Sequence, residues 1–322
     1  MSDDEIEHPI ELGKTGICVP SLGTGAWSWG DRFFWGYGRD YSAEQVQEVF
    51  DLSMEAGINF FDTAEIYGNG MSERFLGRFA PGGKTSDGQE VLIATKFYPF
   101  PWRLWKSTLI GALKRSLKRL NLERVDLYQV HMPLPPVPVE TWAEALGRAV
   151  QEGLARAVGV SNYSADRTRR AHDALDKMGI PLASNQVEYS LLNRQVERNG
   201  VLEACRERGI TVIAYSPLAK GMLTGKYTPD NPPRGFRAAQ YRREHMPKIQ
   251  KLVQLMFEIG RAHDSKTPAQ VAINWAMCKG TLPIPGAKNA RQAQENLGAA
   301  GWRLSMDEVA GLDALSQEVS WL

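Results

Sequence analysis

Short apolar runs alternate with longer segments of helical periodicity along most of the chain. The runs suit strands that are buried on both faces, and they lie at 21–26, 59–61, 91–95, 125–130, 157–160, 184–187, 211–214 and 282–283. Helical patterns cover 43–56, 73–79, 106–120, 141–151, 165–178, 200–208, 248–263, 268–277 and 290–297. Eight alternations of strand and helix predict an α/β fold, a parallel (β/α)8 barrel of the TIM type, rather than an open sheet.

Local signals mark where several of these helices begin. Ser42 followed by Gln45 forms a capping-box pattern, and Thr267 precedes a proline at the first helical position. Ser305 before an acidic turn indicates one more helix start.

Two further segments fall outside the alternation. Residues 10–19 predict a β-hairpin that covers the bottom of the barrel, and 226–246, which lacks apolar periodicity, predicts a long loop. We expect one domain over residues 1–322, with its core at about 12–315.

Composition excludes several classes of function. The chain has 322 residues, of which 43% are apolar and 23% charged, and its net charge of +1 gives no electrostatic case for nucleic acid or an anionic membrane as partner. Cys18, Cys205 and Cys278 lie far apart, which predicts neither a disulfide framework nor a metal site. The acidic start, 1–8, does not fit a secretory signal, so a cytoplasmic protein is expected, with a monomer slightly favoured.

Polar side chains stand at the ends of three successive predicted strands. Asp62, Lys96 and His131 occupy these positions, and Tyr67 lies in the loop after the first of them. Strand C-termini of such a barrel meet at one rim, where catalytic groups gather. Taken alone, Asp62 suits a helix-capping turn, Lys96 a solvated strand tip and His131 a position in the core. Together they predict a proton-donating site for a carbonyl, in which Lys96 lowers the pKa of Tyr67, Asp62 keeps the lysine charged and His131 binds the substrate oxygen.

Five motifs carry a resemblance to a known family: 57–64 with Tyr67 and Gly68, 159–163, 185–189, 214–218 and 284–287. With them the chain resembles the aldo-keto reductase superfamily, and the segments 26–31 and 285–290 look closest to its plastid and cyanobacterial-type members. The resemblance implies a (β/α)8 barrel that reduces aldehydes and ketones with NADPH. It also implies that Tyr67 protonates the substrate, that Lys96 and Asp62 tune it, and that His131 positions the carbonyl.

The resemblance further implies a nicotinamide dinucleotide site along the strand ends. Ser161, Asn162 and Gln186 would hold the carboxamide, and Tyr215 would offer a flat face to the nicotinamide ring. The start of the helix near 290 would bind phosphate through amides and dipole, with Lys288 and Arg291 beside it. Many members carry lysine where this chain has Gly286, a charge that Lys288 can supply. The implied contacts are Gly25, Ala26, Trp27, Asp62, Ser161, Asn162, Gln186, Tyr215, Ser216, Pro217, Leu218, Gly221, Leu223, Lys226, Pro285, Gly286, Ala287, Lys288, Gln292 and Asn296.

Aromatic residues are concentrated in the loops after the first and third strands. A mostly apolar cleft is the usual site for a small ligand, and Trp27, Tyr98 and Trp102 are the expected lining of the substrate pocket. Loop aromatics that only pack on one another are the alternative. Small aldehydes, including aromatic and pyridoxal-like ones, are the expected substrates. Two other functions stay open: a cofactor-binding regulatory subunit of a membrane channel, and an aldose dehydrogenase that runs the reverse reaction.

Overall fold

The computed structural model describes residues 9–228, 230–233, 241 and 243–319. Eight parallel strands follow one another in sequence order around one sheet. They are β3 (Thr24–Gly25), β4 (Phe60–Asp62), β5 (Leu92–Phe97), β6 (Val125–Val130), β7 (Ala155–Ser161), β8 (Leu182–Glu188), β9 (Thr211–Tyr215) and β10 (Leu282–Pro283). The amides of Gly23 and Gly25 donate to the carbonyls of Pro283 and Pro285, both at 3.0 Å, so the last strand meets the first. The predicted (β/α)8 barrel is confirmed.

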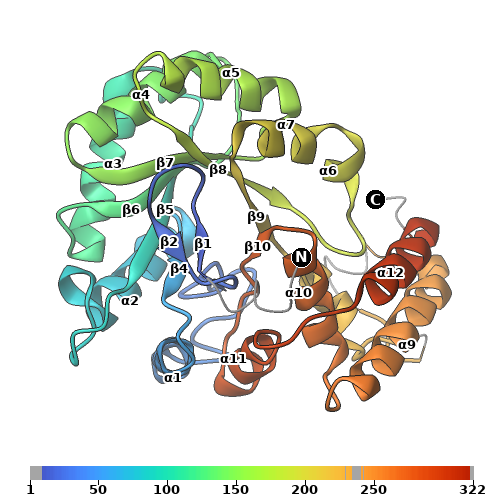
Figure 1. The fold of residues 1–322 in the computed structure, drawn as a ribbon. Helices are drawn as coiled ribbons and strands as arrows, with labels where there is room; N and C mark the ends of the chain where they lie inside the picture. Colours follow the sequence, from blue (N-terminus) through green and yellow to red (C-terminus); the bar gives the residue numbers. More distant parts are fainter. Residues whose placement is uncertain (1–8, 229, 234–240, 242, 320–322) are drawn as a thin grey trace.

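Helices surround the strands, as Figure 1 shows. They are α1 (Ala43–Glu55), α2 (Met71–Phe79), α3 (Lys106–Leu120), α4 (Val139–Gln151), α5 (Ala165–Asp176), α6 (Gln195–Arg198), α7 (Val201–Arg208), α9 (Met246–Ala262), α10 (Pro268–Cys278), α11 (Ala290–Leu297) and α12 (Met306–Val319). The sequence patterns predicted these helices except α6 and α12, and of α12 they marked only the start.

The predicted N-terminal hairpin is present and lies across one end of the barrel (Figure 1). Strand β1 (Ile10–Glu11) pairs antiparallel with β2 (Cys18–Val19). Leu12, Ile17 and Val19 pack into the cluster of interior side chains that includes Phe60, Leu127 and Ile213. Burying these apolar residues closes the bottom of the barrel, so the expected role of the hairpin is confirmed.

Capping boxes form at both helix starts that the sequence marked with Ser42 and Thr267. The Thr267 amide donates to the Gln270 side chain at 2.8 Å, and the Gln270 amide donates back to the threonine hydroxyl at 3.3 Å. Ser42 and Gln45 make the same reciprocal arrangement at the start of α1. Of the predicted loop at 226–246, residues 229, 234–240 and 242 lie outside the described residues, and α9 already begins at Met246.

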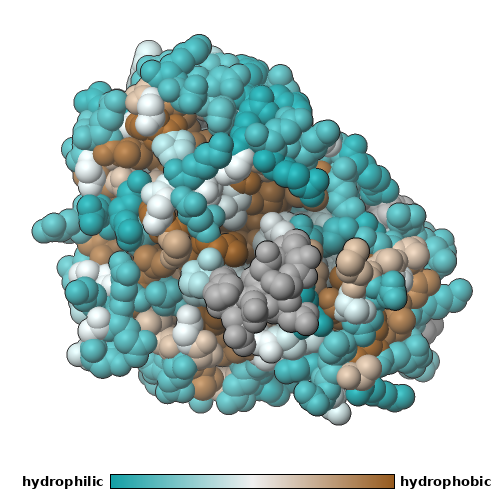
Figure 2. Space-filling model, in the orientation of Figure 1, coloured by the Kyte–Doolittle hydropathy of each residue, from teal (hydrophilic) through white to brown (hydrophobic). Residues whose placement is uncertain are grey.

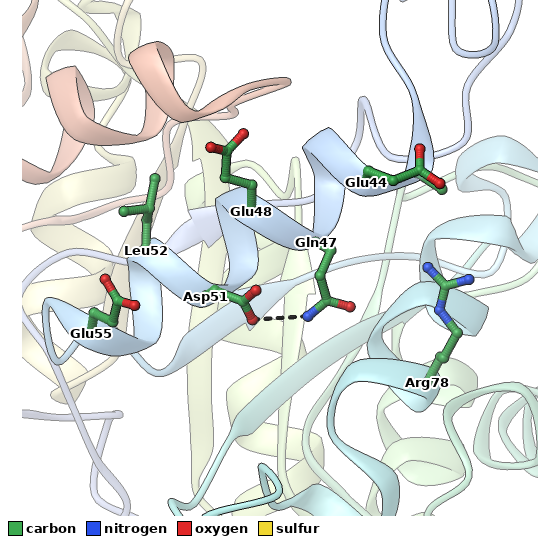
Figure 3. A pocket seen from close by; sticks show the side chains of 8 residues that line it. Glu44, Gln47, Glu48, Asp51, Leu52, Glu55 and Arg78 are labelled. Carbon is green, nitrogen blue, oxygen red and sulfur yellow. Dashed lines mark hydrogen bonds between the residues drawn. The ribbon is translucent and has the colours of Figure 1, made fainter.

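The outer surface is mostly hydrophilic on the face drawn in Figure 2. Figure 3 shows the residues of a groove along α1, several of which are carboxylates. The side-chain amide of Gln47, which also lines the groove, donates to Asp51 at 2.8 Å. None of the predicted site residues lines this groove. No helix in the described part of the chain combines the length and apolar character needed to cross a membrane.

Candidate active site

Three strand ends bring the predicted catalytic residues to one rim of the barrel. Asp62 ends β4, Lys96 is the penultimate residue of β5, and His131 directly follows β6. Tyr67 begins the short 3-10 helix η2 (Tyr67–Gly70) in the loop after β4. The ring centroids of Tyr67 and His131 are 5.6 Å apart and nearly perpendicular. The structure therefore gathers all four residues.

A buried ion pair between Lys96 and Asp62 lies at the centre of this group. The Lys96 ammonium donates to Asp62 Oδ1 and, at 2.9 Å, to the carbonyl of Thr63. It also lies 5.1 Å from the centroid of the Tyr67 ring. Burial lowers the pKa of Lys96, while Asp62 and the more distant Glu73 oppose that shift. A carboxylate in direct contact is what keeps a buried ammonium charged.

The pKa of Tyr67 differs from the sequence expectation. Although the residue is partly exposed, burial raises its pKa well above the ordinary value, and the negative charge of Asp62 adds to the effect. The net lowering of this pKa that the sequence argument expected is not found, because burial of the phenol is the largest cause and the charge of Asp62 acts in the same direction.

His131 is held in its neutral form. Burial, with the positive charge of Lys96 as a second cause, lowers the pKa of His131 to about 3. Its Nδ1 is buried, and it has no hydrogen-bond partner among the described residues. Because a neutral imidazole carries a hydrogen on one nitrogen only, this ring can donate a single hydrogen bond to a carbonyl oxygen.

Two buried amides hold the second oxygen of Asp62. Gln186 Nε2 donates to Asp62 Oδ2 at 2.8 Å, and Gln129 Nε2 does so at 3.3 Å. The sequence reasoning assigned Gln186 to the cofactor and missed Gln129. A signal existed, since Gln129 lies two residues before His131 and thus on the same inward face of β6. A fully buried glutamine there needs a polar partner.

The residues expected at the nicotinamide also lie together. Asn162 donates to the carbonyl of His131 at 3.0 Å and to Ser161 Oγ at 2.9 Å, and its own Oδ1 accepts from the Tyr215 hydroxyl at 2.9 Å. Ser161 in turn donates to the carbonyl of Gln186 at 2.9 Å. These bonds fix the Tyr215 ring at the ends of β7, β8 and β9, next to the catalytic group.

The two expected phosphate segments follow β9 and β10. In the first, Lys226 Nζ would lie 3.0 Å from a Cβ atom placed on Gly221, whose φ of 92° requires glycine. Leu223 is fully buried in the core, so only its backbone can serve a ligand. The other residues expected here are Ser216, Pro217 and Leu218, which connect β9 to the 3-10 helix η4 (Ala219–Thr224).

The second segment leads into α11, whose cap is Asn289. Its Oδ1 accepts from the amide of Gln292 at 3.1 Å, and Asn296 donates to the carbonyl of Gly286 at 3.2 Å. Lys288 donates to the carbonyl of Trp35 at 3.2 Å, with its ammonium 5.3 Å from the Trp35 ring. The remaining expected residues lie where β3 meets the segment after β10: Gly25, Ala26, Pro285 and Ala287.

The three expected pocket residues occupy different depths. The Trp27 ring lies 6.2 Å from that of Tyr67, and the Tyr98 ring lies 5.6 Å from that of His131. Trp102 is 72% exposed and stacks on Phe100 at 4.8 Å. Trp27 and Tyr98 thus border the predicted catalytic residues, whereas Trp102 lies farther out.

The fold and the residues at its rim define a (β/α)8 barrel with a candidate active site at one end, and comparison with known proteins identifies its family. The model of the Aldo/keto reductase family matches residues 21–317. The chain belongs to the aldo/keto reductase family.

Individual relatives carry oxidoreductase names. The chain is 41% identical over 319 residues to the chloroplastic pyridoxal reductase of Arabidopsis thaliana, covering 96% of this chain and 86% of that protein. It is 33% identical over 319 residues to the L-glyceraldehyde 3-phosphate reductase of Escherichia coli strain K12, covering 94% and 90%.

Solved structures show the same architecture. A thermostable aldo-keto reductase in complex with the inhibitor epalrestat has a TM-score of 0.75 at 30% identity, with 95% of this chain and 99% of that chain covered. The glycerol dehydrogenase of Gluconobacter oxydans, at 24% identity and a TM-score of 0.83 over 97% and 95% of the two chains, shows a likeness of fold alone.

Proposed function

We propose that this chain reduces aldehydes and ketones to alcohols with NADPH. The observation that carries the proposal is the buried Lys96–Asp62 pair beneath the Tyr67 ring, with the neutral imidazole of His131 facing the same ring. A protonated phenol, a hydrogen-bond donor and a buried cation at one point are the groups that carbonyl reduction needs beside a hydride donor.

Each of the four residues has a distinct part in this reaction. The neutral imidazole of His131 orients the carbonyl by a hydrogen bond to its oxygen, and the Tyr67 hydroxyl donates its proton to the same oxygen. Loss of the proton converts Tyr67 to a phenolate, and the ammonium of Lys96 stabilises this anion. Asp62, bonded to Lys96, Gln186 and Gln129, keeps that ammonium charged and in place.

The residues at the rim fit a nicotinamide dinucleotide. NADPH, when bound, supplies the hydride for the carbonyl carbon. The amides of Asn162 and Gln186 suit the carboxamide, and the fixed ring of Tyr215 suits the flat nicotinamide. Lys288 and the start of α11 suit the 2′-phosphate, which distinguishes NADPH from NADH.

Pyridoxal is the first substrate to test, because the Arabidopsis relative is named for it. The experiment measures oxidation of NADPH with pyridoxal, other aldehydes, ketones and sugars, using the Tyr67→Phe variant as the blank. Reduction of at least one carbonyl that the blank does not reduce supports the proposal. An absence of turnover across the panel would favour the regulatory-subunit alternative, and faster turnover of sugars with NADP+ would favour the aldose dehydrogenase.

We further propose that the chain acts as a single-domain monomer in the cytoplasm. Its near-neutral net charge of +1 offers no electrostatic attraction to a membrane surface or to nucleic acid. Size-exclusion chromatography with light scattering measures the mass directly, and a mass of twice 35.9 kDa would contradict the monomer. Cell fractionation tests the location.

A further inference from the structure

The loop that follows β5 is restrained by its own sequence. Pro99 and Pro101 alternate with aromatic residues, and each proline fixes its φ angle. The Phe100 amide donates to the Tyr98 carbonyl at 2.9 Å, and the Arg103 amide donates to the Phe100 carbonyl at 2.8 Å. A loop with these bonds presents its side chains in one defined arrangement.

Its aromatic side chains form a continuous row that leads away from the catalytic histidine. The Tyr98 ring lies 5.6 Å from that of His131, Phe100 lies 4.7 Å from Tyr98, and Trp102 stacks on Phe100 at 4.8 Å with only 6° between the planes. We call Tyr98, Phe100 and Trp102 the aromatic row. It extends from the edge of the catalytic group to the solvent.

An ion pair between two loops holds this row in place. Arg103 pairs with both carboxylate oxygens of Glu65, a residue of the loop that carries Tyr67. Two hydrogen bonds from this pair hold the backbone of Tyr98: its amide donates to Glu65 at 2.8 Å, and its carbonyl accepts from Arg103 at 2.8 Å. The guanidinium also lies 5.1 Å from the Phe100 ring.

Burial makes this pair more rigid than an ordinary surface ion pair. The side chains of Arg103 and Glu65 are only 15% and 7% exposed. The guanidinium of Arg103 donates to both carboxylate oxygens of Glu65 and to the carbonyl of Tyr98. The rings of Phe97 and Phe100 lie against it. Arg103 is thus engaged with its own protein, which suits a positioning role better than the capture of an anionic ligand.

We propose that the Glu65–Arg103 pair positions the aromatic row as a wall of the substrate pocket and thereby favours planar aromatic aldehydes over saturated ones. This inference rests on the proposed reductase function and assigns it a substrate class. A flat aromatic ring can stack on an aromatic wall or meet its edge, whereas a saturated ring packs on it only through C–H groups. Such ring pairs add a factor of about two to ten in affinity beyond burial of area.

Benzaldehyde and cyclohexanecarbaldehyde are the matched substrates, because both carry a six-membered ring and only the first is planar. Their intrinsic reactivities differ, so the measured quantity is the ratio of their kcat/KM values, compared between wild type and variants. The variants are Arg103→Met, Glu65→Gln and Trp102→Ala. Arg170→Met is the control, because Arg170 makes a similar two-bond pair with Glu140 on the exposed surface.

We expect Arg103→Met and Glu65→Gln to lower the benzaldehyde-to-cyclohexanecarbaldehyde ratio about five- to tenfold, mainly through a higher KM for benzaldehyde. Arg103→Lys should restore part of the ratio, since it keeps the charge but loses the fork. Trp102→Ala should lower the ratio about twofold, and Arg170→Met should leave it unchanged. Thermal unfolding of every variant shows which of them are folded.

An unchanged ratio in folded Arg103→Met overturns the inference. If that variant does not fold, Trp102→Ala decides, because an exposed tryptophan can be truncated without loss of the core. 4-Carboxybenzaldehyde serves as a third substrate, and a loss in Arg103→Met that is confined to it would mean that Arg103 binds an anion, which also overturns the inference. Wild-type protein that reduces neither aldehyde nor any other carbonyl refutes the proposed function itself, whereas reduction with unchanged ratios refutes only the selectivity.

Discussion

The neutral state of His131 should make the protein sensitive to acid in a measurable way. Its pKa falls to about 3 in the fold, compared with 6.5 for a free histidine. At a pH between these values the unfolded chain binds a proton that the folded chain does not. The neutral state of His131 therefore contributes its full stabilisation above about pH 6.5, and this stabilisation is lost as the pH falls toward about 3.

The size of this effect follows from the shift. Each pH unit in that window costs about 1.4 kcal/mol, so lowering the pH from about 7 to about 5 should cost about 2 kcal/mol through His131 alone. The neighbouring groups are the ammonium of Lys96 and the rings of Tyr67 and Tyr98. The repulsion by Lys96 and the buried surroundings both oppose protonation, which is why the shift is large.

The measurement is the free energy of unfolding in urea at several pH values, for wild type and for His131→Gln. Other acidic groups titrate equally in both proteins, so the difference between the two curves isolates the histidine. We expect the wild type to lose about 2 kcal/mol more than the variant between about pH 7 and about pH 5. Parallel curves would show that His131 takes up its proton in the folded protein, and the neutral donor role would then be wrong.

Four other substitutions test the remaining parts of the site. Tyr67→Phe should lower turnover at least about 100-fold with NADPH affinity unchanged, as measured by NADPH oxidation and fluorescence titration; turnover above about a tenth of wild type would contradict it. Lys96→Met should abolish reduction and cost about 3–5 kcal/mol in urea unfolding, because it leaves the Asp62 charge buried and unpaired. Adding Asp62→Asn should restore most of that stability but no turnover, and restored turnover would refute the role of the pair. Lys288→Ala should weaken NADPH binding about tenfold to 100-fold and leave NADH unchanged; equal loss for both cofactors would place the 2′-phosphate elsewhere.

Much of the fold was predictable because a barrel repeats one simple pattern. Most strands are short and largely apolar, and the polar residues at or next to the ends of β4, β5 and β6 gather at one rim. Helix α12 was harder to predict because its buried positions include Ser316 between Leu312 and Val319, so its apolar stripe is sparse. Its start at Ser305 was visible because capping is a local interaction.

The partners within the site depend on contacts between distant segments. Gln129 meets Asp62 only because β6 lies two strands from β4 in the barrel with a particular register. Glu65 and Arg103 are likewise joined across 38 positions of sequence. Neither pair has a local signature, because each residue alone resembles an ordinary strand or loop residue. The sequence therefore predicted which strand-end residues lie together at the rim but not which side chains hold them.

The pKa of Tyr67 is a further property of the site that the sequence argument did not predict. The sequence argument included Lys96 and its partner Asp62 but not the burial of the phenol. In the fold Asp62 is bonded to Lys96, yet burial is the largest cause of the Tyr67 shift and the charge of Asp62 adds to it. The raised pKa keeps the phenol protonated at neutral pH, which is the state that a proton donor needs. In the proposed reaction the Lys96 ammonium stabilises the phenolate that forms when the proton leaves, and it thereby offsets part of the cost that burial adds to this step.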